Sequence, residues 1–105
     1  MSAPVRVVVV DDEELARERL RRLLEREPDV AVVAECANGK EAVREVLARR
    51  PDVLFLDVQM PGLDGFGVLE ALGPQGVPPA VVFVSAYAEF AVRAFEAYAL
   101  DYLLK

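Results

Sequence analysis

Acidic, hydroxyl and amino side chains end four short apolar runs of this chain. They are Asp11, Asp12, Asp57, Ser85 and Lys105. Charged groups seldom end a buried strand unless water, a metal or a counter-charge can reach them. The carboxyl ends of parallel strands all lie at one edge of a sheet, which is where open sheets of this kind bind ligands. We therefore expect these side chains to converge on one site.

Each of these residues also has an ordinary structural interpretation. Asp12 can begin a helix, where the helix dipole favours an acid, and Ser85 can cap the helix after it. Lys105 can be an exposed terminal lysine, and Asp57 can simply start the turn that follows it. Because all of these residues are expected at the same sheet edge, a functional site is favoured over a separate structural role for each.

The chemistry of such a site would be phosphoryl transfer. Two carboxylates about 5 Å apart repel each other by roughly 3 kcal/mol at an effective dielectric near 20. An oxygen-only cluster of Asp11, Asp12 and Asp57 would relieve this repulsion by binding a hard cation such as Mg²⁺. We expect Lys105 to add a fixed positive charge on the far side and Ser85 to add a hydroxyl donor. Asp57, on the middle strand, is the candidate nucleophile that forms an acyl phosphate.

The apolar pattern predicts the elements that must position these residues. Strands are expected at Val5–Val10, Val30–Cys36, Val53–Leu56, Val81–Val84 and Asp101–Leu104. Helices are expected from Glu13 to the segment before Pro28, at Lys40–Arg50, at Phe66–Leu72 and at Ala86–Tyr98. This alternation, with short connections, predicts parallel strands joined by right-handed crossovers in a layered α/β sheet.

The helical periodicity also predicts which side chains face the core. The expected inward residues are Ala16, Leu20, Leu23 and Leu24; Ala42, Val43, Val46 and Leu47; and Ala91, Ala94, Phe95 and Tyr98. Cys36, the single cysteine, is expected to be a small buried hydrophobe because it lies in an apolar segment and has no partner for a disulfide.

The composition limits the classes of function. A chain of 105 residues, 54% hydrophobic and 29% charged, predicts one globular domain. The net charge of -6 argues against direct nucleic-acid binding by this segment, and the absence of histidine excludes sites built on that residue. No apolar run approaches the roughly 20 residues of a membrane span. We expect a cytoplasmic protein.

Four motifs, in order, match a known family. They are Val-Val-Val-Asp11-Asp12-Glu-Glu, Leu-Phe-Leu-Asp57-Val-Gln-Met-Pro-Gly-Leu-Asp-Gly65, Val-Ser85-Ala86 and Asp-Tyr102-Leu-Leu-Lys105. Over essentially its whole length the chain resembles the receiver domain of two-component response regulators. The segment from Ala94 to Lys105 looks most like receivers joined to LytTR-type DNA-binding domains. The resemblance implies a doubly wound, flavodoxin-like sheet of five parallel strands in the order 2-1-3-4-5.

The resemblance also implies a role for each site residue. Asp57 would accept a phosphoryl group from a phosphohistidine on a sensor histidine kinase, and Lys105 would pair with the phosphoryl oxygens. Mg²⁺ would be held by Asp12, Asp57 and the backbone carbonyl of Gln59, with Asp11 reaching the ion through water. Ser85 would move to the phosphoryl group and Tyr102 would swing inward beside it, a rotation that the small Ala86 permits. Gln59 and Tyr87 would border the path of the attacking water, where Tyr87 could slow hydrolysis.

Receivers that resemble this chain continue past the lysine with a proline and a fifth helix, and residues 1–105 contain neither. We therefore expect a receiver domain truncated after the fifth strand, with one face of the last two strands exposed. That face would belong to a longer regulator with a DNA-binding domain, or would be covered in a homodimer.

Two other functions stay open. One is a protein-interaction module of the same fold that does not depend on phosphorylation. The other is a phosphatase with an aspartyl nucleophile. Such enzymes commonly carry an acid two residues after the nucleophile, and Gln59 at that position disfavours turnover. We expect a switch with limited self-catalysed chemistry rather than a true enzyme.

Overall fold

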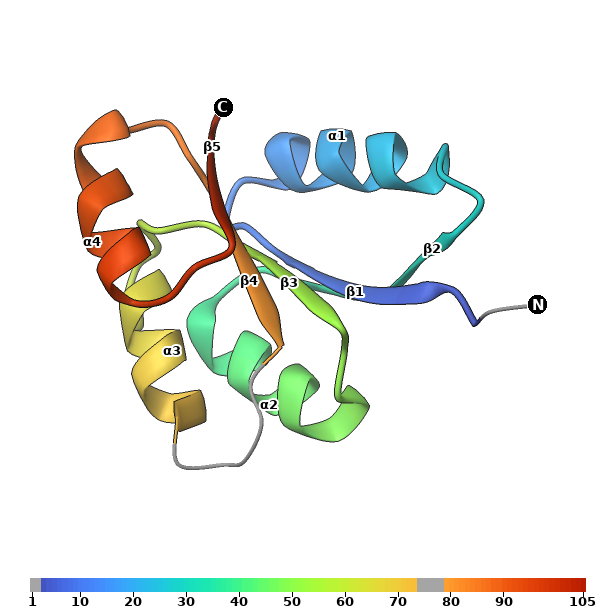
Figure 1. Cartoon of the computed structure of the whole chain (residues 1–105), viewed down its shortest axis with the longest axis horizontal. Coiled ribbons are helices and arrows are strands. Elements are labelled where there is room, and N and C mark those ends of the chain that lie inside the picture. The colour runs from blue at the N-terminus through green and yellow to red at the C-terminus, as the bar shows by residue number, and fades with distance from the viewer. Residues whose placement is uncertain (1–2, 74–78) are drawn as a thin grey trace.

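A computed structural model describes residues 3–73 and 79–105, which form one parallel five-stranded sheet (Figure 1). Its strands are β1 (Val5–Val10), β2 (Val30–Cys36), β3 (Val53–Leu56), β4 (Ala80–Ser85) and β5 (Asp101–Leu104). The strand order is β2-β1-β3-β4-β5, and every neighbouring pair is parallel. The doubly wound α/β fold expected from the sequence is confirmed, and four of the five strands match their expected bounds.

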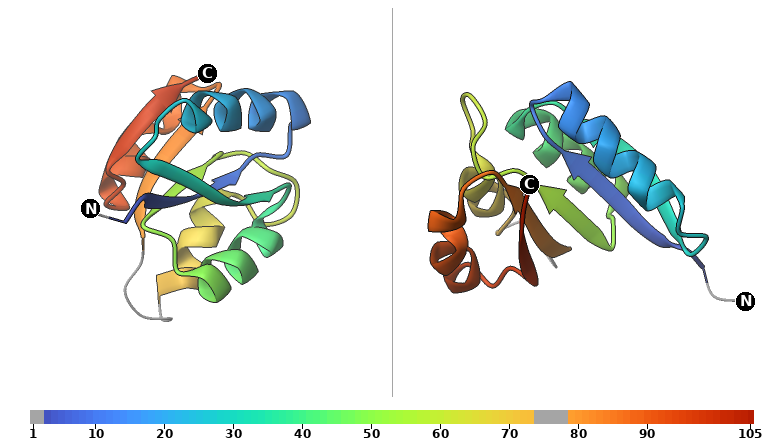
Figure 2. Two further views of the ribbon diagram at one scale, coloured as in Figure 1. Left: turned by 90° about the vertical axis from the view of Figure 1, so that its right-hand side faces the viewer. Right: turned by 90° about the horizontal axis from the view of Figure 1, so that it is seen from above.

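Helices lie on both sides of this sheet (Figures 1 and 2). They are α1 (Glu14–Glu25), α2 (Gly39–Arg49), α3 (Gly65–Leu72), the 3₁₀ turn η2 (Ala88–Phe90) and α4 (Ala91–Glu96). Helix α1 covers one face, whereas α2 and α3 pack side by side on the other. Within residues 3–73 and 79–105, none of the helices has the length and apolarity that crossing a membrane requires.

The core is built on valine. Val7, Val8, Val9 and Val10 of β1 are at most 2% exposed, because helices cover both faces of this central strand. β-branched side chains suit a pleated surface that is buried on both sides. Each fully buried side chain of this size contributes about 1.5–3 kcal/mol of hydrophobic stabilisation relative to exposure. The strand that carries the acidic pair is thus buried along its last four residues.

The burial of the second helix and of the cysteine agrees with the sequence. Ala42 and Val46 of α2 are buried, Val43 and Leu47 pack against the core at partial exposure, and Cys36 is 1% exposed. Burial raises the pKa of the Cys36 thiol to about 12, so this side chain is an unreactive packing residue.

Three predicted inward residues are instead exposed. Leu23 is 52% exposed because the groove between α1 and β5, lined in part by Leu20 and Leu104, is open to solvent. Phe95 and Tyr98 are 54% and 94% exposed. Helix α4 is shorter than predicted, beginning at Ala91 and ending at Glu96, so only Ala94 on its inner face is fully covered. The predicted helix, Ala86–Tyr98, begins five residues before α4, of which Ala88–Phe90 form the 3₁₀ turn η2, and ends two residues after it.

Tyr98 ends α4 in a left-handed conformation. Its φ is 63°, and the N–H of Ala99 donates to the carbonyl of Ala94 across it, a closure typical of helix C-termini. Glycine is the usual residue at this position because a Cβ atom makes the left-handed region costly by about 1–2 kcal/mol. An exposed tyrosine here therefore lowers stability.

Replacing Tyr98 with glycine should stabilise the fold. We expect Tyr98→Gly to raise the free energy of unfolding by about 0.5–1 kcal/mol, because relief of the left-handed strain exceeds the extra backbone entropy of glycine in the unfolded chain. Urea denaturation measures the change. Tyr98→Ala is the control, since it removes the ring but keeps the Cβ; an equal gain in that variant would show that the ring, not the backbone, causes the strain.

Candidate functional site

The backbone ladder of the sheet continues one residue beyond the strands and thereby fixes the site residues. The N–H of Asp57 donates to the carbonyl of Val10 (3.0 Å), and the N–H of Lys105 donates to the carbonyl of Ser85 (2.8 Å). Asp11 is held in the same way by β2. Residues that are as far apart as 11 and 105 in the sequence are therefore set at one sheet edge by main-chain hydrogen bonds alone.

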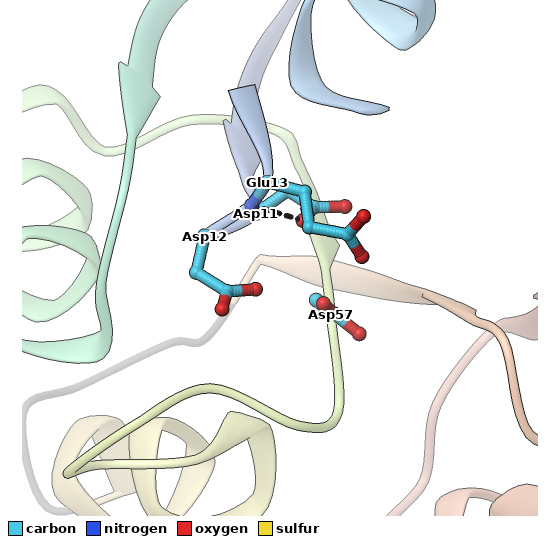
Figure 3. A group of neighbouring side chains, drawn as sticks. All are labelled: Asp11, Asp12, Glu13 and Asp57. Carbon is cyan, nitrogen blue, oxygen red and sulfur yellow. Dashed lines mark hydrogen bonds between the residues drawn. The ribbon is translucent and has the colours of Figure 1, made fainter. Parts of the chain in front are cut away.

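Four carboxylates gather at this edge (Figure 3). One oxygen from each of Asp11, Asp12, Glu13 and Asp57 lies within 4.8 Å of the others. Asp11 and Asp57 are each 5% exposed, whereas Asp12 and Glu13 are exposed. Convergence of the three predicted acids is confirmed. Glu13 was not predicted; its place directly after the acidic pair was the available signal. The helix expected from Glu13 begins one residue later, so Glu13 is the N-cap residue of α1.

The ammonium group of Lys105 lies among these acids. Its Nζ is 2.9 Å from Asp11 Oδ2, 3.2 Å from Asp57 Oδ2 and 3.4 Å from Glu13 Oε1. The lysine side chain is only 20% exposed. The sequence predicted Lys105 on the far side of Asp57; the structure instead places its charge between Asp57 and Asp11. In this arrangement the lysine balances part of the negative charge of the cluster.

Burial and mutual charge shift the pKa values of this pair. Burial, and then the charge of Asp11, raise the pKa of Asp57 to about 6, while Lys105 opposes the rise. Burial would lower the pKa of Lys105, but its hydrogen bonds to Asp11 and Asp57 and their charges outweigh that effect and raise it. The lysine is therefore always charged near neutral pH, and Asp57 is mostly ionised.

The cluster fits a hard divalent cation. It offers carboxylate oxygens alone, which Mg²⁺ prefers over nitrogen or sulfur. The 4.8 Å spread of the oxygens is close to the roughly 4.2 Å that separates two oxygens on opposite sides of one Mg²⁺ ion. Asp12 and Glu13 are also open to solvent, so an ion has a path of entry.

The loop after Asp57 is held tightly beneath it. The N–H of Gly65 donates to the carbonyl of Val58 (2.8 Å), and a Cβ at position 65 would lie 2.5 Å from the carbonyl oxygen of Asp57, so glycine is required there. Asp64 caps α3 by accepting a hydrogen bond from Gly67 N–H (2.8 Å). Gln59 is exposed on this loop, beside a shallow hollow.

Ser85 and Tyr102 meet through Tyr87. Ser85 is fully buried, and its Oγ accepts a hydrogen bond from the N–H of Tyr87 (3.1 Å). The hydroxyl of Tyr102 donates to the carbonyl of Tyr87, and its ring packs against Phe83 with centroids 6.3 Å apart. Ala86, between Ser85 and Tyr87, is exposed. Ser85 and Tyr102 are thus both hydrogen-bonded to the backbone of the same residue, Tyr87.

Without a divalent cation, the charge on Asp57 should cost stability. A folded-state pKa near 6 exceeds the ordinary value near 4, so the folded state binds the proton more tightly, and that stabilisation is lost as pH rises through about 6. We expect Asp57→Asn to raise the free energy of unfolding by about 1–2 kcal/mol at pH 7.5 and to have little effect at pH 4. Urea denaturation in a chelator at both pH values measures this. An equal effect of the substitution at both would contradict it.

Comparison with solved structures supports the same fold. The response regulator domain of Thermotoga maritima CheB has a TM-score of 0.88 and 31% identity, over 97% of this chain and 78% of that one. The response regulatory domain of protein mrkE from Klebsiella pneumoniae has a TM-score of 0.86 and 33% identity, over 95% of this chain and 82% of that one.

Sequence comparison gives relatives that are longer than this chain. The transcriptional regulatory protein BtsR of Escherichia coli K12 is 48% identical, over 96% of this chain and 42% of BtsR. The sensory transduction protein LytT of Bacillus cereus is 45% identical, over 96% of this chain and 41% of LytT. The chain thus spans about two fifths of the length of these relatives. Residues 7–105 match the model of the response regulator receiver domain, and the chain belongs to that family.

Proposed function

We propose that this chain is a phosphorylation-controlled signalling switch in which Asp57 accepts a phosphoryl group from a sensor histidine kinase. The observation that carries the proposal is the position of Asp57. It is a buried carboxylate at the edge of the sheet, beside the Lys105 ammonium and a cluster of oxygen donors for a cation. A nucleophile, a fixed positive charge and a cation site are what phosphoryl transfer to a carboxylate needs.

In this proposal one Asp57 carboxylate oxygen forms a bond to phosphorus while the bond from phosphorus to the donor breaks. The electron pair of that bond leaves with the donor group, which is imidazole from a phosphohistidine or acetate from acetyl phosphate. Asp12, Asp57 and the Gln59 carbonyl, with Asp11 through water, would hold Mg²⁺, which supplies charge neutralisation at the phosphoryl oxygens when bound. Lys105, already 3.2 Å from Asp57, pairs with those oxygens.

The response to phosphorylation would pass through Ser85, Ala86 and Tyr102. Ser85 has a hydroxyl that can turn to a phosphoryl oxygen, but this hydroxyl now accepts the hydrogen bond of Tyr87 N–H. Tyr102 is bonded to the carbonyl of the same Tyr87. Movement of Ser85 would therefore change the segment that holds Tyr102, with little hindrance from the small, exposed Ala86. This shared contact is what supports the two residues as a coupled pair.

The output is proposed to be control of transcription through a DNA-binding domain. BtsR, a relative at 48% identity, is a transcriptional regulatory protein, and it is more than twice as long as the matched segment. A net charge of -6 makes the segment itself a poor ligand for nucleic acid. The LytTR type of domain, a cytoplasmic location and a homodimer that covers the groove between α1 and β5 stay predictions.

Phosphorylation of Asp57 can be tested directly. Incubation of the chain with acetyl phosphate and Mg²⁺ should add one phosphoryl group in an intact-mass measurement, and Asp57→Asn should abolish the gain. Lys105→Met should lower the phosphorylation rate at least about tenfold, because the phosphoryl oxygens lose a charged partner.

Two outcomes would favour the alternatives. A folded chain that binds Mg²⁺ but gains no mass would favour a phosphorylation-independent interaction module. Sustained release of inorganic phosphate from many donor molecules per chain would favour an aspartyl phosphatase, which Gln59 in place of an acid disfavours.

Tyr87 should control the lifetime of the phosphorylated state. Tyr87, two residues beyond Ser85, is 47% exposed, and its ring packs edge-on against that of Phe90 with centroids 6.2 Å apart. If the ring shields the acyl phosphate from water, Tyr87→Ala should shorten the half-life severalfold, whereas Tyr87→Phe should leave it nearly unchanged. The decay of the phosphorylated mass after removal of acetyl phosphate measures both. An unchanged lifetime in the alanine variant would refute the shielding role.

A further inference from the structure

Glu13 differs from the other two carboxylates that Lys105 contacts. The side chains of Asp11 and Asp57 are 7% and 6% exposed, whereas that of Glu13 is 69% exposed. Its oxygen is also the most distant of the three from the ammonium, at 3.4 Å. Lys105 is thus bonded to two buried acids and lies within reach of one acid at the mouth of the site.

The position of Glu13 in the fold points to a role other than helix capping. Glu13 is the N-cap residue of α1, where serine, threonine, aspartate or asparagine is usual, and its side chain makes no capping hydrogen bond. Its backbone is nevertheless fixed, because its N–H donates to Asp11 Oδ1 (2.9 Å) and its carbonyl accepts from Arg17 N–H (3.0 Å). A fixed backbone thus holds a carboxylate that makes no cap and instead pairs with the Lys105 ammonium at 3.4 Å.

A divalent cation and the lysine both draw on the carboxylates of Asp11 and Asp57. Asp11 and Asp57 are two of the proposed cation-binding acids, and each has an oxygen within 3.2 Å of the Lys105 ammonium. Two positive groups beside the same pair of carboxylates repel each other. Entry of the cation therefore favours movement of the ammonium away from the buried acids.

We propose that Glu13 is a positioning residue that accepts the Lys105 ammonium when a divalent cation binds Asp11 and Asp57. The inference rests on the cation site of the proposed function and deepens it. Glu13 lies on the solvent side of the lysine, so a small outward movement shortens the 3.4 Å contact while lengthening the two buried ones. In this position Lys105 stays at the mouth of the site, where an incoming phosphoryl group meets it.

A double-mutant cycle on Mg²⁺ affinity tests this role. Calorimetric titration of Mg²⁺ is carried out on the wild-type chain, Glu13→Gln, Lys105→Met and the double variant. If Glu13 acts by receiving the lysine, Glu13→Gln should weaken Mg²⁺ binding about threefold to tenfold more in the wild-type background than in the Lys105→Met background. Glu14→Gln, the neighbouring exposed acid at the start of α1, is the matched control for loss of one negative charge and should weaken binding by less than about twofold.

The opposite results have distinct meanings. An equal loss of Mg²⁺ affinity in both backgrounds would show that Glu13 acts on the ion by its charge alone and would overturn the inference, as would an equal effect of Glu14→Gln. The cycle needs no phosphoryl transfer, so a failure of Asp57 to be phosphorylated leaves it unaffected. Circular dichroism of each variant confirms folding, and Lys105→Gln repeats the cycle with a polar side chain if the methionine variant does not fold.

Discussion

The contact of the Lys105 ammonium with Asp11 and Asp57 is the interaction on which the site depends. Two carboxylates, each 5% exposed, lie at one sheet edge and would repel each other strongly without a cation between them. The lysine supplies that cation from the opposite end of the chain. The same contact raises the pKa of Lys105 and limits the rise in the pKa of Asp57. The same ion pair thus stabilises the sheet edge and places a positive charge beside Asp57, where the proposed phosphoryl transfer takes place.

The sheet makes this contact possible because the parallel ladder aligns strands that are remote in sequence. The valines of β1 bury the centre of the sheet, and β3 and β4 continue it toward β5. Helices cover both faces of the sheet, and the carboxyl ends of its strands meet at one edge (Figure 1). Rigid strands therefore place the reactive groups, and the loop from Val58 to Gly65 packs beside Asp57, which is 5% exposed.

Two apolar surfaces stay exposed beside the last two elements of the chain, β5 and α4. One is the groove between α1 and β5, where Leu23, Leu103 and Leu104 are exposed; the other is the outer side of α4, with Val92 and Phe95. Both surfaces include β5 or α4, the elements that follow Ser85 and that carry or precede Tyr102. Exposed apolar area of this kind is typical of surfaces that contact other protein segments, which agrees with a domain whose relatives are longer chains.

The sequence alone determined the strands, their parallel arrangement and the convergence of Asp11, Asp12 and Asp57, because buried apolar runs joined by short crossovers permit few other arrangements. It also placed Lys105 at the sheet edge. The strand order followed from the family resemblance. Only the tertiary structure placed the Lys105 ammonium between Asp57 and Asp11, because a flexible four-carbon side chain can reach several nearby acids and sequence does not say which of them are buried. It brought Glu13 into the cluster, and it left Leu23, Phe95 and Tyr98 exposed. Periodicity identifies the apolar face of a helix, but only the packed neighbours determine whether anything covers that face.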